Sequence, residues 1–528
     1  MLPPLTLPAR AAALALLLAV SLISISPTGA IGAAGQETPP SRIETAPTAL
    51  PAIDRGTRQL PIEWHAQLEQ FRAQREAGSR QPVAGRVLVK FHAGASASMR
   101  AAAAQSVGGR LSSRSASALQ YDVFEIDEGA RPEAVASELA SRPDVEYAQA
   151  DYRVYPRWRP NDPKYVHQWN YPLLNMEAAW EVDRGADDSI IVAVLDTGVA
   201  YRAATFEYDV PGFRAGPYIY PSLGRITVPF APAPDLARDN RFVAPRDFIW
   251  NDESPLDVDG HGTHVAGTIG QLSNNGLEGV GMAFNARLMP VKVIAGDWDQ
   301  ILRAPGGGTD DTVARGIRYA VDNGARVLNL SLGREGPSSP VMEEALRYAV
   351  SKGAVVTIAA GNSYQEGNPD EVPARYGPSI AGVITVGAVG HEGNRSYYSA
   401  VKSYVEVAAP GGDVRANGED GLIYQQMFDP DAAVLWPIQR TLPPSQYHAP
   451  RFDVFAFVGI QGTSMAAPHV AGLAALIMHH GVKDPGAVEQ TIKQFALDRG
   501  AAGPDPEYGA GLINPPASLR GRGLGLTR

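Results

Sequence analysis

The sequence predicts an α/β protein in which helices cover both faces of a mostly parallel sheet, preceded by a small α+β unit. From about residue 159 onwards, short continuous apolar runs alternate with helical patterns. Strands that are buried on both faces of a parallel sheet have this appearance. The chain has 528 residues, which is long for one domain, and 45% of them are hydrophobic, so a large core can form.

The elements of the large part, residues 157–528, follow one another in a regular order. Helical patterns at residues 312–323 and 340–352 lie between apolar runs. The expected strands are residues 190–195, 288–294, 327–332, 355–360 and 383–389. Stretches near residues 201–258 and 411–458 interrupt this order and are longer than ordinary connections, so we expect them to be insertions.

The small unit is expected over residues 83–156. Residues 86–91 and 121–126 alternate like strands, and a last extended segment covers residues 145–154. Helical patterns occupy residues 95–105 and 132–141. This β-α-β-β-α-β order fits a ferredoxin-like domain, although any small α+β module fits the pattern equally well.

The start of the chain has the layout of a signal peptide over residues 1–30. Arg10 precedes an apolar run at residues 11–25, and the small residues Gly29 and Ala30 follow. The alternative is a membrane anchor, but a spanning helix needs about 20 apolar residues. We therefore expect a secreted protein with no stable membrane anchor. Residues 31–82, rich in Pro, Ala, Gly, Gln and Arg, predict a disordered linker.

Composition excludes several classes of site. The net charge is −10 and no block of Lys and Arg stands out, so no nucleic-acid partner is expected. The chain has no cysteine, which rules out disulfides, zinc–thiolate sites and a cysteine nucleophile.

Three motifs carry candidate catalytic side chains. Asp196 follows an apolar strand, at the sheet edge where α/β proteins bind ligands, although an Asp there is more often a turn former. His261 stands at a glycine-flanked helix start; with His264 it could bind zinc, but the Glu of the His-Glu-x-x-His motif is missing. Ser464 lies near the start of another helix, where partial positive charge stabilises an anion, or it is merely an N-cap.

A fourth candidate, Asn362, follows the strand at residues 355–360, and its side-chain amide could donate to a developing oxyanion. The chain order Asp, His, Ser is that of subtilisin rather than of chymotrypsin or the α/β-hydrolases. The Gly-x-Ser-x-Gly elbow of the latter is absent because Ala466 replaces its second glycine.

Residues 196–198, 261–267 and 462–468 resemble the three signatures of the subtilisin family, and the resemblance covers residues 161–514. It implies a subtilisin-like three-layer α/β/α fold and a secreted serine endopeptidase that works through an acyl-enzyme. Ser464 would attack the scissile carbonyl, His261 would transfer the proton, and Asp196 would orient the imidazole. Asn362 and the Ser464 backbone amide would form the oxyanion hole.

The resemblance extends to the substrate side of the site. Residues 329–333 resemble the segment that pairs with an extended substrate, so Ser331, Leu332 and Gly333 are expected to contact protein or peptide substrates. Glu371 would lie at the base of the primary specificity pocket, with Asp370 beside it. This implies a preference for Arg or Lys before the cleaved bond, unless Glu371 faces solvent or pairs with Arg375.

The position of the small unit resembles that of the family's propeptide, which assists folding and inhibits the enzyme. Residues 142–152 resemble the last strand of such a prodomain, and residues 161–169 resemble a mature amino terminus. We expect the zymogen to cut itself between about residues 154 and 161, and the mature enzyme to be a monomer.

No cofactor is required for this chemistry, but a structural calcium ion is a further expectation. Acidic residues crowd the loop before His261: Asp252, Glu253, Asp257 and Asp259. Calcium takes six to eight oxygen ligands, often carboxylates. Subtilases of the thermitase kind carry calcium in a similar loop, whereas the alternative is an acidic solvated loop.

Two rival functions remain open at this point. A non-catalytic relative would bind peptides without cleaving them, but every residue of the catalytic pattern is present. A secreted lipase or esterase is the other rival, and the missing nucleophile elbow argues against it. Digestion of casein with and without a covalent serine-hydrolase inhibitor separates the three.

Overall fold

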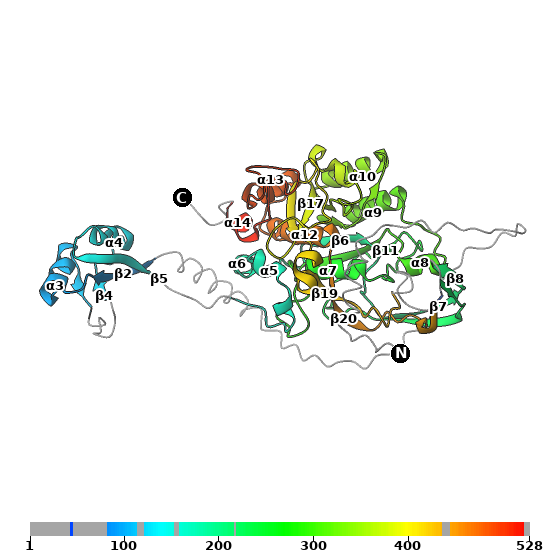
Figure 1. Ribbon diagram of the computed structural model, residues 1–528, viewed down its shortest axis with the longest axis horizontal. Coiled ribbons are helices and arrows are strands. Elements are labelled where there is room, and N and C mark those ends of the chain that lie inside the picture. Colours follow the sequence, from blue (N-terminus) through cyan, green and yellow to red (C-terminus); the bar gives the residue numbers. More distant parts are fainter. Residues whose placement is uncertain are drawn as a thin grey trace, which may run out of the picture. The chain divides into compact units, whose positions relative to one another are not determined.

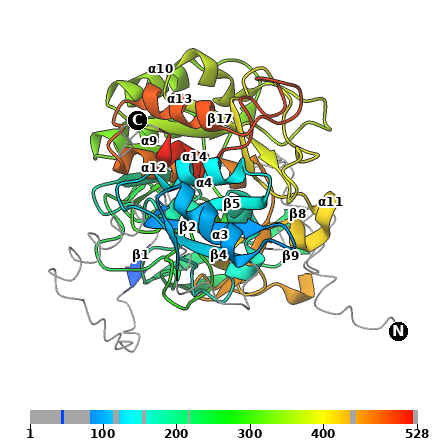
Figure 2. The same cartoon turned by 90° about the vertical axis from the view of Figure 1, so that its left-hand side faces the viewer.

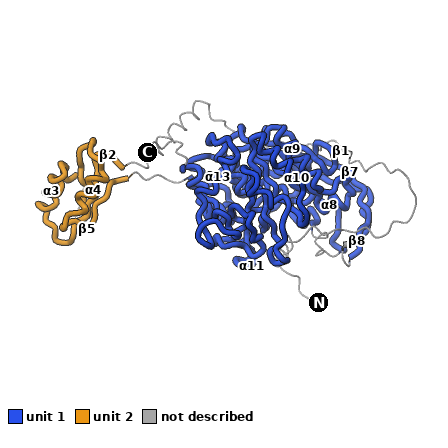
Figure 3. The backbone as a smooth tube through the Cα atoms, turned by 90° about the horizontal axis from the view of Figure 1, so that it is seen from above, with its two compact units in different colours: residues 1–49, 158–528 blue, residues 50–157 orange. Residues whose placement is uncertain are grey.

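The computed structural model describes residues 43–45, 82–112, 121–152, 158–215, 218–435 and 444–521. The chain divides into two compact units, Met1–Ala49 with Trp158–Arg528 and Leu50–Arg157 (Figure 3). The predicted signal peptide, residues 1–30, lies outside the described residues. Among the helices that are described, none has the length and apolar character to cross a membrane.

A seven-stranded sheet in the order β11-β12-β6-β13-β15-β17-β18 forms the centre of the large unit. Every pairing in it is parallel, which confirms the predicted mostly parallel sheet. Its strands are β6 (Ile191–Asp196), β11 (Arg246–Asp247), β12 (Arg287–Lys292), β13 (Val327–Leu330), β15 (Val355–Ala359), β17 (Val383–Val389) and β18 (Val407–Pro410).

Helices cover both faces of this sheet, which gives the expected three layers (Figure 1). Along β6, Val192 and Val194 face one core, and Ala193 and Leu195 face the other. The first core includes helices α7 (His261–Gly270), α12 (Thr463–His479), α13 (Pro485–Phe495) and α14 (Pro515–Arg520), and the second includes α9 (Asp310–Asp322) and α10 (Pro340–Ser351). The shorter helical segments are α5 (Asn170–Leu173), α6 (Met176–Trp180), α8 (Asp297–Ile301), α11 (Val414–Asn417), η1 (Tyr165–His167), η2 (Ala374–Ser379), η3 (Gly418–Gly421) and η4 (Pro444–Gln446).

The small unit has the expected order of strands and helices (Figure 2). Its elements are β2 (Pro82–Phe91), α3 (Ala97–Ser106), β3 (Arg110–Leu111), β4 (Asp122–Glu125), α4 (Pro132–Ala140) and β5 (Val145–Tyr152). The antiparallel sheet has the order β3-β4-β2-β5. A separate apolar core, which includes Val87, Phe124 and Leu139, holds the unit together. The ferredoxin-like alternative is therefore confirmed.

The stretch at residues 201–258 contains a sheet of its own. Strand β7 (Ala204–Val210) pairs with β10 (Gly224–Phe230) on one side and with β1 (Ile43–Thr45) on the other, while β8 (Phe213–Ala215) pairs with β9 (Tyr218–Tyr220). The prediction that residues 31–82 are an unstructured linker is therefore wrong at Ile43–Thr45, because their backbone takes up the open edge of β7. Most of the other residues of that stretch lie outside the described part.

Two further strand pairs lie close to the sheet edge that carries the site. Strand β19 (Ile423–Phe428) pairs with β20 (Phe455–Ile460), both within or beside the stretch at residues 411–458, and β14 (Arg334–Glu335) pairs with β16 (Glu371–Val372). The β19 strand packs against α7: a Cβ atom on Gly267 would lie 3.2 Å from the Cβ of Gln425. This second stretch thus supports the helix that carries His261.

Candidate active site

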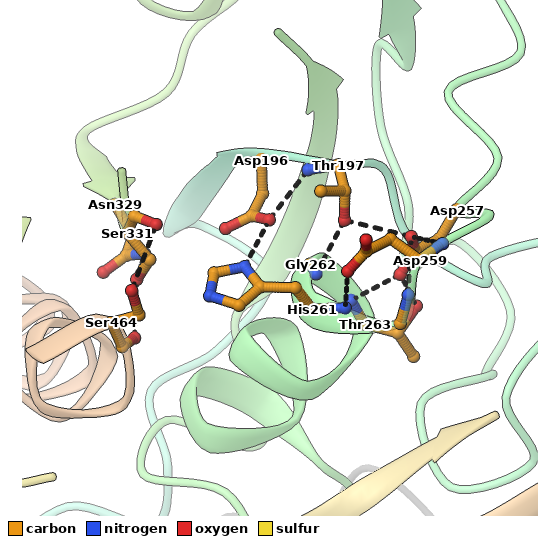
Figure 4. A network of polar contacts seen from close by, with 11 residues as sticks. Asp196, Thr197, Asp257, Asp259, His261, Gly262, Thr263, Asn329, Ser331 and Ser464 are labelled. Carbon is orange, nitrogen blue, oxygen red and sulfur yellow. Dashed lines mark hydrogen bonds and ion pairs between the residues drawn. The ribbon is translucent and has the colours of Figure 1, made fainter. Parts of the chain in front are cut away.

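Asp196, the last residue of β6, lies fully buried at the carboxyl end of the central sheet. Its Oδ1 accepts the Thr197 backbone N–H at 2.7 Å and lies 2.7 Å from Nδ1 of His261 (Figure 4). Since a carboxylate only accepts hydrogen bonds, the His261 proton sits on Nδ1 in the neutral ring. The other ring nitrogen then carries a lone pair on the side that faces Ser464 in Figure 4.

Contacts between β6 and the start of α7 hold this pair in place. The Thr197 hydroxyl accepts the N–H of Gly262 at 3.0 Å and donates to Asp257 at 3.0 Å. A Cβ atom at position 262 would lie only 2.1 Å from the carbonyl oxygen of Gly198, so only glycine allows this approach. The glycine after His261 therefore permits the short distance between His261 and Asp196.

The charge of Asp196 alters the chemistry of His261. Burial alone would lower the pKa of the imidazole, but attraction to Asp196 and the hydrogen bond with it outweigh this effect. The result is a His261 pKa raised to about 9. The carboxylate thus stabilises the imidazolium that forms when the ring accepts a proton.

Ser464 is the second residue of α12, so its backbone N–H is among the first four of the helix, which lack intrahelical acceptors. Its carbonyl would normally accept the N–H of residue 468, but Pro468 has none. The Ser331 hydroxyl donates to that carbonyl at 2.7 Å instead, and itself accepts from Asn329 at 2.8 Å. The Ser464 hydroxyl donates to the Ser331 carbonyl at 3.3 Å, so it must rotate to reach His261.

Asn362 follows β15 and points its amide towards the start of α12. Its Oδ1 accepts both the backbone N–H of Thr463 at 2.8 Å and the Thr463 hydroxyl at 2.9 Å. These two bonds determine the orientation of the amide and leave its NH₂ group for another acceptor. This role of Thr463 in orienting Asn362 was not predicted from the sequence. Its position next to Ser464 was the only feature that pointed to a role in the site.

The Subtilase family model matches residues 187–511, more than half of the chain, and this range contains all four of these side chains. The chain belongs to the subtilase family. This subtilase is 31% identical over 429 residues to the thermophilic serine proteinase of Bacillus sp. (strain AK1), with 81% of this chain and 86% of the relative covered. It is 29% identical over 406 residues to the extracellular protease of Xanthomonas campestris pv. campestris, covering 74% and 62% respectively.

A solved structure of a protease from Pseudoalteromonas arctica PAMC 21717 superposes with a TM-score of 0.51. It shares 28% sequence identity with this subtilase, and the match covers 69% of this chain and 99% of that one. The Fervidolysin N-terminal prodomain model matches residues 69–151. This subtilase is thus a serine endopeptidase with an amino-terminal prodomain, which implies peptide substrates and an intramolecular propeptide.

His264, the second histidine of the motif, is structural. Burial lowers its pKa to about 3, so the ring is neutral. Its Nε2 lies 3.0 Å from the Ile423 carbonyl and 3.1 Å from the Val458 carbonyl. The ring therefore bonds α7 to the β19–β20 pair. Because His261 faces Asp196 and His264 faces these two carbonyls, the structure does not support the zinc alternative for the two histidines.

The predicted calcium ligands Asp252, Asp257 and Asp259 do not form a common set. Asp257 accepts five hydrogen bonds, from the Thr197 and Thr263 hydroxyls and three backbone N–H groups. Asp252 accepts from the Ser254 N–H at 2.8 Å and Asp259 from the His261 N–H at 3.2 Å. In the part of the chain that is described, no three His, Cys, Asp or Glu side chains could hold a metal. In this structure these carboxylates bind the loop's own donors, and calcium binding stays a prediction.

Of the four residues predicted to contact substrate, Ser331 contacts Ser464, and the other three lie close to Ser331 in sequence or beside Gly333. Ser331 bonds to Ser464 directly, and Leu332 and Gly333 follow it. The Glu371 carboxylate lies next to Gly333: a Cβ atom added to this glycine would be 3.1 Å from Oε2. Glu371 is thus buried behind the segment that contacts Ser464, rather than turned towards solvent.

Proposed function

We propose that Ser464, His261 and Asp196 form the catalytic triad of this endopeptidase. The Ser464 Oγ adds to the scissile carbonyl carbon while its proton passes to Nε2 of His261, and Asp196 stabilises the resulting imidazolium. The proton then moves to the leaving amine, which departs and leaves an ester on Ser464. Water attacks this ester and gives a proton to His261, which passes it to the Ser464 Oγ as the ester bond breaks and the acid is released.

The observation that carries this proposal is the 2.7 Å contact between Asp196 and His261, with the other edge of the ring towards Ser464 (Figure 4). The raised pKa of His261 supports its assignment as the base. We assign Asn362 and the Ser464 N–H as oxyanion donors, because the Thr463 bonds turn the Asn362 NH₂ group away from that residue.

We further propose that the enzyme is secreted and cuts its own chain after the prodomain. A relative from Xanthomonas campestris is named an extracellular protease, and the first thirty residues have a signal-peptide pattern. The predicted cleavage region, between about residues 154 and 161, begins outside the described residues. We propose that the mature protein is a monomer without a stable membrane anchor. We also propose that it can bind a structural calcium ion, which the chemistry does not require.

One experiment tests the triad and the self-cleavage together. The wild type and Ser464→Ala should be produced separately in an exporting host and their amino termini sequenced. The wild type is expected to begin between residues 155 and 161 and to digest casein, with a covalent serine-hydrolase inhibitor abolishing the activity. Ser464→Ala should retain residues 82–152 and be inactive. Normal maturation of the alanine variant would contradict self-cleavage, and digestion by it would contradict the triad.

A further inference from the structure

Glu371 occupies a buried position next to two glycines, Gly333 and Gly361. It opens β16, where its Cα partner across the antiparallel pair is Glu335 of β14. Its backbone N–H donates to the Tyr404 hydroxyl at 3.1 Å, and its residue surface is only 8% exposed. The backbone pairing and the burial together restrict where this carboxylate can point.

The carboxylate points between two glycines. A Cβ atom on Gly361 would lie 2.5 Å from Cγ and 3.2 Å from Oε1 of Glu371, and one on Gly333 would lie 3.1 Å from Oε2. Gly361 immediately precedes Asn362, and its N–H donates to the Thr463 hydroxyl at 3.2 Å. Both glycines therefore belong to segments that contact the start of α12. Because neither glycine has a side chain, the Glu371 carboxylate fits between them.

Within the described part of the chain, the Glu371 carboxylate has neither an ion pair nor a side-chain hydrogen bond. Burial raises its pKa to about 7, and repulsion by Glu335 adds to this effect. The neighbouring Asp370 differs, because Lys402 lies 2.8 Å and Arg375 3.8 Å from its carboxylate. The alternative pairing of Glu371 with Arg375 is therefore not adopted. An unpaired buried charge is unfavourable, and a cation brought by a ligand would relieve it.

We propose that Glu371 binds the substrate side chain that precedes the scissile bond, and that this side chain is Arg in preference to Lys. The inference rests on the proposed function, because it places the substrate by Ser464. Both carboxylate oxygens lack a partner, and the planar guanidinium can bond to both, whereas an ammonium is a point charge. The substrate class is thus extended polypeptides with basic residues.

The test is kcat/KM on peptides that differ only at this position, carrying Arg, Lys, Gln, Leu or Phe. The mature wild type should prefer Arg over Leu by at least about 100-fold, and Glu371→Gln should reduce the Arg value about 100-fold while Leu is kept or improved. Asp370→Asn is the matched control, one residue away and paired on the surface, and should leave the Arg-to-Leu ratio unchanged.

The pH dependence of the Arg-to-Leu ratio distinguishes substrate binding by Glu371 from a purely structural role, because a structural role would leave this ratio unchanged. The Arg-to-Leu ratio should rise as pH increases through about 7 in the wild type, where Glu371 loses its proton in the free enzyme, and stay flat in Glu371→Gln. The groups around it are Glu335 on β14, Tyr404, and the Asp370 pairs with Lys402 and Arg375. Titration of His261 affects both substrates and cancels in the ratio.

The outcomes separate this inference from the proposed function. Equal or better cleavage after Leu and Phe than after Arg and Lys, or an unchanged ratio in Glu371→Gln, would overturn the assignment of Glu371 while inhibitor-sensitive cleavage kept the triad intact. Cleavage that survives both the inhibitor and Ser464→Ala would instead remove the proposed function itself.

Discussion

Lys292 and Asp299 form an ion pair in which the Nζ-to-Oδ2 distance is 2.7 Å and both side chains are fully buried. Lys292 ends β12 opposite Asp196 in the sheet register. Its ammonium also donates to the Leu256 carbonyl, and Asp299 accepts from Trp250 and the Gly296 N–H. The pair thus connects the end of the sheet, beside the proposed triad, with α8.

Removing the cation from this pair should cost far more stability than removing a surface cation. Lys292→Met would leave the Asp299 charge buried without compensation, and we expect a loss of about 3–5 kcal/mol in the free energy of unfolding. Arg347→Met, at the exposed pair with Glu343, is the control and should cost less than about 1 kcal/mol. Urea unfolding in a Ser464→Ala background avoids self-digestion; equal losses in both variants would contradict the expectation.

Asp196→Asn should reduce kcat about 10⁴-fold if Asp196 orients the imidazole of His261, because an amide can donate to Nδ1 and favour the wrong tautomer. The measurement is hydrolysis of a chromogenic peptide under saturating substrate. An unchanged thermal midpoint would show that the fold survives. A loss of less than tenfold would be inconsistent with the assigned orientation.

Activity should increase with pH, with a midpoint near the His261 pKa of about 9. Only the neutral imidazole can accept the serine proton, and the active fraction grows as the ring loses its charge. The same shift contributes stability that is fully present below pH 6.5 and is lost as pH rises through about 9. Initial rates from pH 6 to 10 test this, and a midpoint near 6.5 would refute it.

Asn362→Ala should lower kcat by about a hundred- to a thousand-fold and change KM little, because an oxyanion donor acts on the transition state. Asn368→Ala is a control in the same loop, where the amide instead bonds to the Val401 backbone. It should leave kcat within a few-fold. If both variants lost activity equally, disruption of the loop rather than loss of a donor would explain the result.

Metal removal should not act through Asp252. Its carboxylate caps a turn at Ser254, so Asp252→Asn should leave any shift of the melting midpoint between EDTA and excess calcium unchanged. Melting curves of the wild type and the variant under both conditions provide the comparison. Loss of a wild-type calcium response in the variant would restore Asp252 as a ligand.

The central sheet was predictable because its strands are short and apolar on both faces. The run at residues 383–389 coincides with β17, and the helical pattern at residues 340–352 ends one residue beyond α10. The outer strands β11 and β18 were not predicted. Strand β11 has only two residues, and β18 consists of one valine, two alanines and a proline, so neither forms a strongly apolar run that stands out.

The candidate site was predictable in its members and less so in its contacts. Glycine-flanked motifs identify Asp196, His261 and Ser464, but the sequence cannot show that Ser331 replaces the amide missing at Pro468. The contacts of the acidic loop were not predictable for a similar reason. A run of carboxylates has the composition of a calcium site, while the local backbone conformation decides whether they converge on a cation or on their own N–H groups.

Strand β1 comes before the prodomain in the sequence and pairs with β7, which comes after it. Along the chain, the prodomain therefore lies between two stretches of the same compact unit. One cut between about residues 154 and 161 would therefore produce two polypeptides that still share a sheet, rather than a free inhibitor and a free enzyme. Under the proposed maturation, the rate of unpairing at Ile43–Thr45 and not only the rate of bond cleavage would govern when the prodomain departs. The segment that contains β1 would then set how long the prodomain stays bound after cleavage.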